Sequence, residues 1–187
     1  VFLASLFLIS AFILSAQNIP SPKQFLGYEL GDHFTPAYKI VNYFNAVAQA
    51  APSMVKVQKY GETNEGRDMI VAFISSAQNI QNLENIRQNN LRLADMQKDN
   101  TAADANAPAI VWLSYNVHGN EPSSSEAAMK VLYALIDPDN AQAKEWLQHV
   151  VVIIDPCQNP DGRDRYVNWY NTAVGNQFNA DPQSREH

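Results

Sequence analysis

Cysteine is almost absent from this chain of 187 residues, and its single copy, Cys157, excludes an internal disulfide bond. A basic run is lacking too, because the 13 lysines and arginines are scattered among 19 aspartates and glutamates. This distribution argues against a nucleic-acid partner. The sequence contains no internal repeat or low-complexity segment, and its length suffices for one domain with a sizeable core.

The N-terminal stretch VFLASLFLISAFILSA contains no charged side chain. It is shorter than the run of about 20 apolar residues that spans a bilayer, but it suits the apolar core of a secretory signal. We therefore expect residues 1–16 to be a signal peptide, cleaved after Ala16, that sends the protein to the periplasm or outside the cell without stable membrane insertion. An uncleaved anchor and a buried helix are the alternatives. The missing initiating methionine and basic start predict a clipped N-terminus.

The rest of the chain divides into an extended leader, residues 17–34, and a domain, residues 35–187. Helical spacing of apolar residues and strand-like alternation predict the first elements of the domain. These are a helix over 35–50 capped by Thr35, two strands over 54–60 and 69–75 that form a hairpin, and a helix over 79–96.

A strand–helix–strand unit follows in the second half. Strands over 108–115 and 149–155 are continuously apolar, as is typical of strands covered on both faces, and helices over 124–136 and 140–147 lie between them. Ser123 and Glu126 have the spacing of a capping box. The two strands should be parallel, and ligands bind outside the carboxyl ends of such strands. The loops over 116–123 and 156–165 both leave from those ends.

The first of these loops holds His118-Gly119-Asn120-Glu121. An imidazole and a carboxylate are suitable zinc ligands, and Gly119 lets the backbone bend so that both side chains face one point. The alternative is a surface histidine beside an unrelated glutamate, and spacing alone leaves both interpretations open. In the second loop, Asn159-Pro160-Asp161-Gly162-Arg163, strong turn formers favour a plain turn.

Three stretches, in this order, carry a resemblance to a known family: GETNEGRDMIVAFISS at 61–76, HGNEP at 118–122 and QNPDGR at 158–163. They resemble the zinc metallocarboxypeptidase family, typified by the pancreatic digestive carboxypeptidases. SPKQFLGYELGDHF at 21–34 is similar to the opening of a bacterial secreted branch.

The resemblance implies an α/β fold with a mixed, mostly parallel sheet and helices on both faces. It implies one zinc ion, held by His118, Glu121 and a third histidine from further along the chain. Zinc would activate water and polarise the scissile carbonyl at peptide or protein C-termini, with a distant glutamate as general base. Arginines would bind the substrate carboxylate and stabilise the oxyanion.

The departures from the family pattern concern the remaining ligands. Candidates for the third histidine are His33, His149 and His187, but we expect the true ligand beyond His187 and the domain to be incomplete at its C-terminus. The general-base glutamate is missing as well, so we expect the fragment alone to be inactive. Arg185 lies where the family places its oxyanion arginine, although an exposed loop arginine is an equal alternative.

Four other side chains near these motifs receive lesser roles. Arg67 fits a structural turn arginine, Arg163 and Arg165 fit structural or rim positions, and Cys157 has no evident base partner for nucleophilic chemistry. The segment over 168–187 is polar and turn-rich.

Two other functions remain open: a zinc amidohydrolase or deacylase acting on N-acyl amino acids or cell-wall peptides, and a non-catalytic binding module of the same fold.

Overall fold

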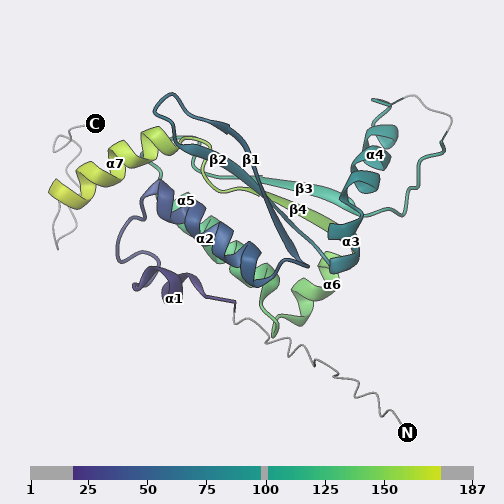
Figure 1. Ribbon diagram of the computed structural model, residues 1–187, viewed down its shortest axis with the longest axis horizontal. Helices are drawn as coiled ribbons and strands as arrows, with labels where there is room; N and C mark the ends of the chain where they lie inside the picture. The colour runs from purple at the N-terminus through teal and green to yellow at the C-terminus, as the bar shows by residue number, and fades with distance from the viewer. Residues whose placement is uncertain (1–18, 98–100, 174–187) are drawn as a thin grey trace, which may run out of the picture.

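A four-stranded sheet lies at the centre of the part of the chain that the computed structural model describes, residues 19–97 and 101–173 (Figure 1). In spatial order its strands are β1 (Val55–Glu62), β2 (Asp68–Ile74), β4 (Val150–Asp155) and β3 (Ala109–Ser114). The β1–β2 hairpin and the β3–β4 parallel pair are confirmed. The sheet is mixed, but β2 runs antiparallel to β4, so among the described strands the expectation of a mostly parallel sheet is wrong.

Alternation along the strands divides the apolar side chains between two faces of the sheet. One face carries the larger core, which includes Ala72, Ile74, Val152 and Ile154. The other carries a smaller cluster of Val71, Val151 and Ile153 beneath Ile86.

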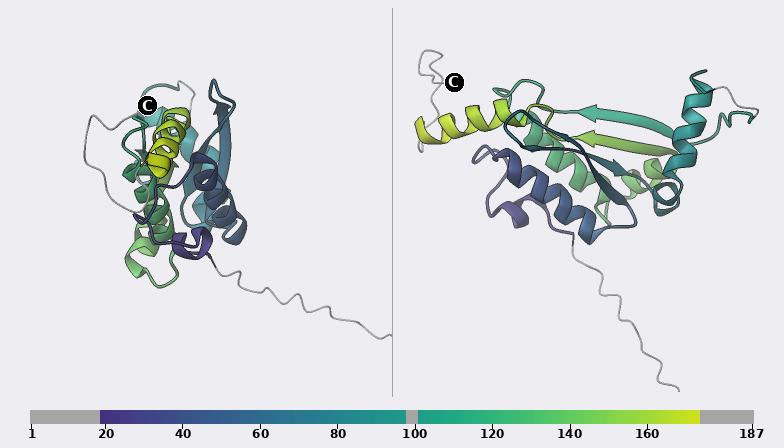
Figure 2. Two further views of the ribbon diagram at one scale, coloured as in Figure 1. Left: turned by 90° about the vertical axis from the view of Figure 1, so that its left-hand side faces the viewer. Right: turned by 45° about the horizontal axis from the view of Figure 1, so that its top comes forward.

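Helices lie on both faces of this sheet, as predicted (Figure 2). The larger core is covered by α2 (Ala37–Ala50), α5 (Ser123–Ile136) and α6 (Ala141–His149), and the smaller cluster by α4 (Leu83–Leu93). The last described helix, α7 (Pro160–Ala173), extends from the end of the sheet at which β4 finishes (Figure 1).

Two further helices are short. The expected extended leader contains α1 (Pro22–Leu26), which starts with a capping box between Ser21 and Gln24. The single helix expected over 79–96 is instead two, α3 (Ala77–Gln81) and α4, and they meet at Asn82.

Strand β3 is more exposed to solvent than the sequence predicted. Val111 and Trp112 keep 40% and 59% of their surface exposed, so the expectation of cover on both faces is wrong for the described residues. The reason is the position of β3, which is the edge strand of the described sheet.

In residues 19–97 and 101–173, no helix has the length and apolar content needed to cross a bilayer. The expected signal peptide lies outside the described residues.

Candidate metal centre

His118 and Glu121 lie in the loop between β3 and α5, at the carboxyl end of the parallel strand pair. His118 Nδ1 is 3.2 Å from Glu121 Oε2, and the two side chains are 69% and 60% exposed. Two ligands that each lie about 2.0–2.2 Å from one tetrahedral zinc ion are themselves about 3.3–3.6 Å apart. The donor types and their separation therefore fit one zinc ion, with an open side for further ligands.

The buried side chain of Asn116 closes this loop from beneath. Its Nδ2 donates to the carbonyl oxygens of His118, at 2.6 Å, and Glu121, at 3.3 Å. The backbone of Asn116 has φ of 56°, in the left-handed region, where asparagine is one of the few tolerated side chains. Sequence reasoning missed Asn116, although its place directly after the strand predicted over 108–115 and two residues before His118 was visible.

The second motif packs directly against this loop. Asn159 donates its backbone N–H to the carbonyl of Asn116, and its side chain donates to the carbonyl of Val117. A Cβ atom on Gly119 would lie 2.1 Å from the carbonyl carbon of Gly162. Gly119 is thus needed for close backbone contact, whereas the sequence suggested a role in bending.

The expectation of a plain turn over residues 159–163 is wrong, because Pro160 begins α7. The Asn159 side chain accepts a hydrogen bond from the backbone N–H of Gly162, as a helix N-cap does. The helix continues to Ala173, so the first part of the expected turn-rich segment over 168–187 is helical.

Arg163 is completely buried and is bonded on every side. Its guanidinium donates to the Thr35 carbonyl, Asn116 Oδ1, the Pro122 carbonyl and Glu126 Oε1, at 2.7–2.9 Å. Burial lowers the pKa of Arg163, and the neighbouring charge of Glu126 opposes that shift. Arg163 therefore has a structural role, which was one of its two expected roles, while Arg165 is exposed and lies 3.8 Å from Glu65.

Glu126 is not the capping-box residue that its spacing suggested. It accepts hydrogen bonds from the backbone N–H and hydroxyl of Thr35, at 2.7 and 2.9 Å, in addition to the bond from Arg163. Thr35 consequently does not cap α2, whose N-cap position is Pro36. The sequence did carry a signal that Glu126 faces the interior. Glu126 stands three residues before Met129, which is buried, and residues at that spacing lie on the same face of a helix.

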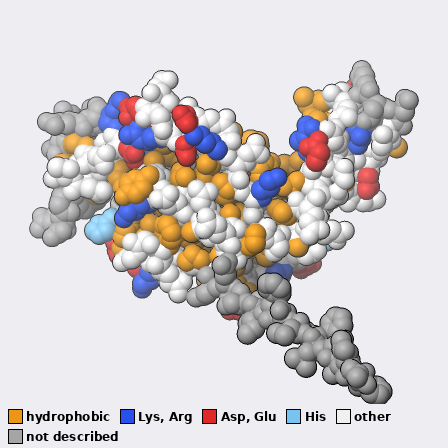
Figure 3. All heavy atoms as spheres, in the orientation of Figure 1, with side chains coloured by type: hydrophobic (Ala, Val, Ile, Leu, Met, Phe, Trp, Pro, Cys, Tyr) orange, Lys and Arg blue, Asp and Glu red, His pale blue; other side chains and the backbone are white. Residues whose placement is uncertain are grey.

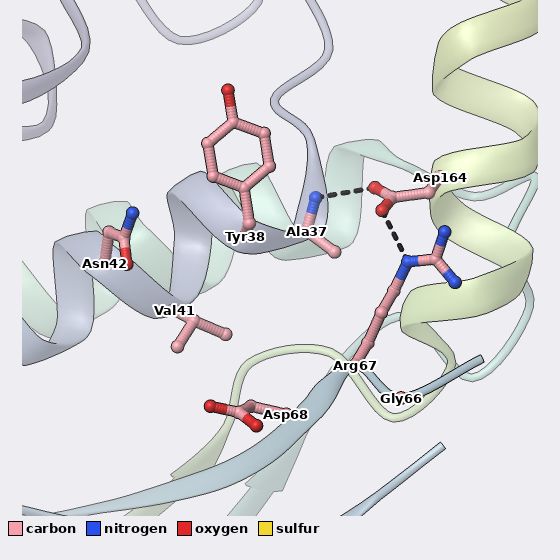
Figure 4. A pocket seen from close by; sticks show the side chains of 8 residues that line it. All are labelled: Ala37, Tyr38, Val41, Asn42, Gly66, Arg67, Asp68 and Asp164. Carbon is pink, nitrogen blue, oxygen red and sulfur yellow. Dashed lines mark hydrogen bonds and ion pairs between the residues drawn. The ribbon is translucent and has the colours of Figure 1, made fainter. Parts of the chain in front are cut away.

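Arg67 joins the hairpin turn to α7. It donates to Asp161 and Asp164, both at 2.7 Å, and also bonds Glu65. Asp164 accepts the backbone N–H of Ala37 at 2.7 Å through its other oxygen, so it links three segments (Figure 4). Figure 3 shows acidic and basic side chains next to each other over this region.

A hollow of about 350 Å³ opens beside Arg67. Tyr38 and Asp68 also line it, as Figure 4 shows, but neither His118 nor Glu121 does. The hollow is therefore separate from the candidate metal centre.

Residues 40–184 match the profile of a family described as zinc carboxypeptidase. The chain belongs to the zinc carboxypeptidase family. No curated protein matches the chain. The membership implies zinc, which fits the donor set of His118 and Glu121.

Solved structures of similar fold include thrombin activatable fibrinolysis inhibitor, at 17% identity and a TM-score of 0.53, over 80% of this chain and 31% of that one. Carboxypeptidase A from Helicoverpa armigera is 22% identical, with a TM-score of 0.52, over 75% of this chain and 29% of that one. These identities show a shared fold. The chain spans less than a third of the length of either relative.

Among the described residues of this zinc carboxypeptidase chain, no group of three metal-binding side chains comes together. His33 lies against Tyr28, before α2, and His149 ends α6 at the opposite end of β4 from the metal motif. His187 and Arg185 lie outside the described residues, so their expected roles stay predictions.

Cys157 is buried beneath the loop, with its Sγ 3.5 Å from Asn116 Oδ1. Burial raises the pKa of its thiol to about 11. A neutral, enclosed thiol is a poor nucleophile, which agrees with the absence of a catalytic role for Cys157.

Proposed function

We propose that the full-length protein is a secreted zinc-dependent carboxypeptidase that hydrolyses the C-terminal bonds of peptides or proteins. His118 and Glu121 are its first two zinc ligands. The observation that carries the proposal is the convergence of His118 Nδ1 and Glu121 Oε2 to 3.2 Å at the carboxyl end of β3, in a chain of this family. Bound zinc would activate a water molecule and polarise the scissile carbonyl.

The residues of this chain have separate parts in that reaction. His118 and Glu121 hold the ion on the exposed side of the loop, where a peptide can approach. Asn159 and Gly162 support the loop from the start of α7. We propose that the third histidine and the general-base glutamate lie beyond His187. Residues 17–187 alone should therefore bind zinc weakly and turn over no substrate.

The test compares the full-length protein with two single variants on two peptides of one sequence, one with a free C-terminal carboxylate and one amidated. His118→Ala removes a proposed ligand, and His149→Ala is the matched control because His149 is exposed at the far end of β4. We expect the wild type and His149→Ala to release the last residue of the free peptide only, a zinc chelator to stop release, and His118→Ala to be inactive.

Other outcomes point to other functions. Zinc binding without peptide hydrolysis would favour an amidohydrolase that acts on N-acyl amino acids or cell-wall peptides. Absence of both zinc and hydrolysis would leave a binding module of the same fold. Full activity of His118→Ala would refute the proposed role of this ligand.

A further inference from the structure

The amide of Asn116 is enclosed by partners on both of its sides. Its Oδ1 accepts from Arg163 Nη1 at 2.9 Å and lies 3.0 Å from the hydroxyl of Ser125. Its Nδ2 faces the carbonyl oxygens of His118 and Glu121. Only 3% of Asn116 is exposed, so bulk water cannot readily replace these contacts.

Arg163 fixes which way this amide points. A guanidinium can only donate hydrogen bonds, so the oxygen of Asn116 must face Arg163 and the NH₂ group must face the loop. Arg163 cannot turn away, because its other N–H groups are held by Glu126 and by the carbonyls of Thr35 and Pro122. The orientation of the amide is therefore set by a buried ion pair in the interior.

We propose that Asn116 is a positioning residue for the metal site, anchored by Arg163, that sets the separation of His118 and Glu121. This inference rests on the proposed zinc site. One NH₂ group holds the backbone carbonyls of both proposed ligands, and so links two residues whose side chains must converge on one ion. Partners that orient metal ligands in this way commonly change metal affinity about 10–100-fold when removed.

Asn116→Asp is the most direct perturbation. It preserves size and the tolerance for left-handed backbone, and it still accepts from Arg163. It places a carboxylate oxygen, in place of an NH₂ group, against the carbonyls of His118 and Glu121. Asn116→Gly is a second variant that removes the amide entirely and suits the same backbone, in case the first variant does not fold.

Asn79 offers a matched control at the other end of the sheet. It is buried to a similar degree, and its Nδ2 donates to the carbonyl oxygens of Leu147 and Gln148 at 3.0 and 3.1 Å. Asn79→Asp therefore makes the same chemical change, to the same kind of contact, without touching the metal loop.

The measurement is the zinc affinity of the metal-free full-length protein, by competition with a chromogenic chelator at a temperature where every variant is folded. We expect Asn116→Asp and Asn116→Gly to bind zinc about 10–100-fold more weakly than the wild type. The zinc affinity of Asn79→Asp should stay within about threefold of the wild-type value, because Asn79 does not contact the proposed ligands. The visible spectrum of bound Co²⁺ should change for the Asn116 variants alone.

Hydrogen exchange in the absence of metal gives a second readout. The backbone N–H of Glu121 donates to the His118 carbonyl at 3.1 Å. Its exchange should accelerate in the Asn116 variants and not in Asn79→Asp.

Two failures can be told apart. If His118→Ala loses zinc but the Asn116 variants bind it as tightly as the wild type, the positioning role is overturned and the proposed zinc site stands. If His118→Ala binds zinc as well as the wild type, the proposed site fails, and the positioning role fails with it.

Discussion

The buried pair of Arg163 and Glu126 allows one prediction to be worked through in detail. Glu126 is 6% exposed and accepts three hydrogen bonds, two from Thr35 and one from Arg163. Glu126→Gln keeps the shape of the side chain but removes its charge. Glu126→Ala removes the partner altogether and leaves the guanidinium of Arg163 buried without a counter-charge.

The expected costs differ between the two substitutions. A hydrogen bond to a charged group contributes about 1.5–3 kcal/mol, so Glu126→Gln should lower the free energy of unfolding by an amount in that range. Breaking a buried ion pair from one side costs about 3–5 kcal/mol, which is the expectation for Glu126→Ala. Both variants leave Arg163 without a counter-charge, but only Glu126→Ala also removes both side-chain oxygens that accept hydrogen bonds from Arg163 and Thr35, and this difference sets the order of the two variants.

Urea denaturation of the full-length protein measures both values. Glu84→Gln is the matched control, because Glu84 pairs with Arg87 on the exposed side of α4 and its loss should leave the midpoint unchanged. Equal urea midpoints for Glu126→Ala and the wild type would refute the reasoning, because loss of the ion pair would then have no effect on stability.

Three further predictions concern residues around the loop. Gly119→Ala should weaken zinc binding at least about tenfold, because its Cβ would meet the backbone of Gly162; calorimetric titration measures this, and unchanged affinity would contradict the contact. Burial raises the pKa of Asp155 above its ordinary 3.8, so the ionised carboxylate destabilises the fold, and stability is lost as the pH rises through that raised pKa. Asp155→Asn should therefore gain thermal stability over the wild type as the pH rises from 3.8 through that raised pKa; a difference independent of pH would argue against this. Cys157 should react with a thiol reagent far more slowly in folded than in urea-unfolded protein, and equal rates would show that it is accessible.

The strands and the place of the metal motif could be predicted from the sequence because both depend on local patterns. Alternation along β1 and the apolar run of β2 indicated a hairpin, and the apolar runs of β3 and β4 indicated a parallel pair. The antiparallel contact of β2 with β4 joins segments far apart in the chain, and no local pattern encodes it. The exposure of β3 depends on which strands lie beside it, for the same reason.

The polar interior beneath the site was the part that the sequence reading missed. Glu126 has capping-box spacing from Ser123, but its partners Thr35 and Arg163 lie 91 and 37 residues away, so spacing favoured the wrong interpretation. The Asn159-Pro160 pair was misread in another way. It forms turns, but it also suits an N-cap followed by the first helical residue, and the second use is the one in the structure.

Zinc content of the full-length protein tests the central claim most directly, measured for the wild type, His118→Ala, Glu121→Ala and His149→Ala after dialysis. The proposal predicts one zinc ion per chain in the wild type and in His149→Ala, and loss of zinc from the other two. Retention of a full zinc equivalent by both His118→Ala and Glu121→Ala would contradict it, because the metal would then be held elsewhere.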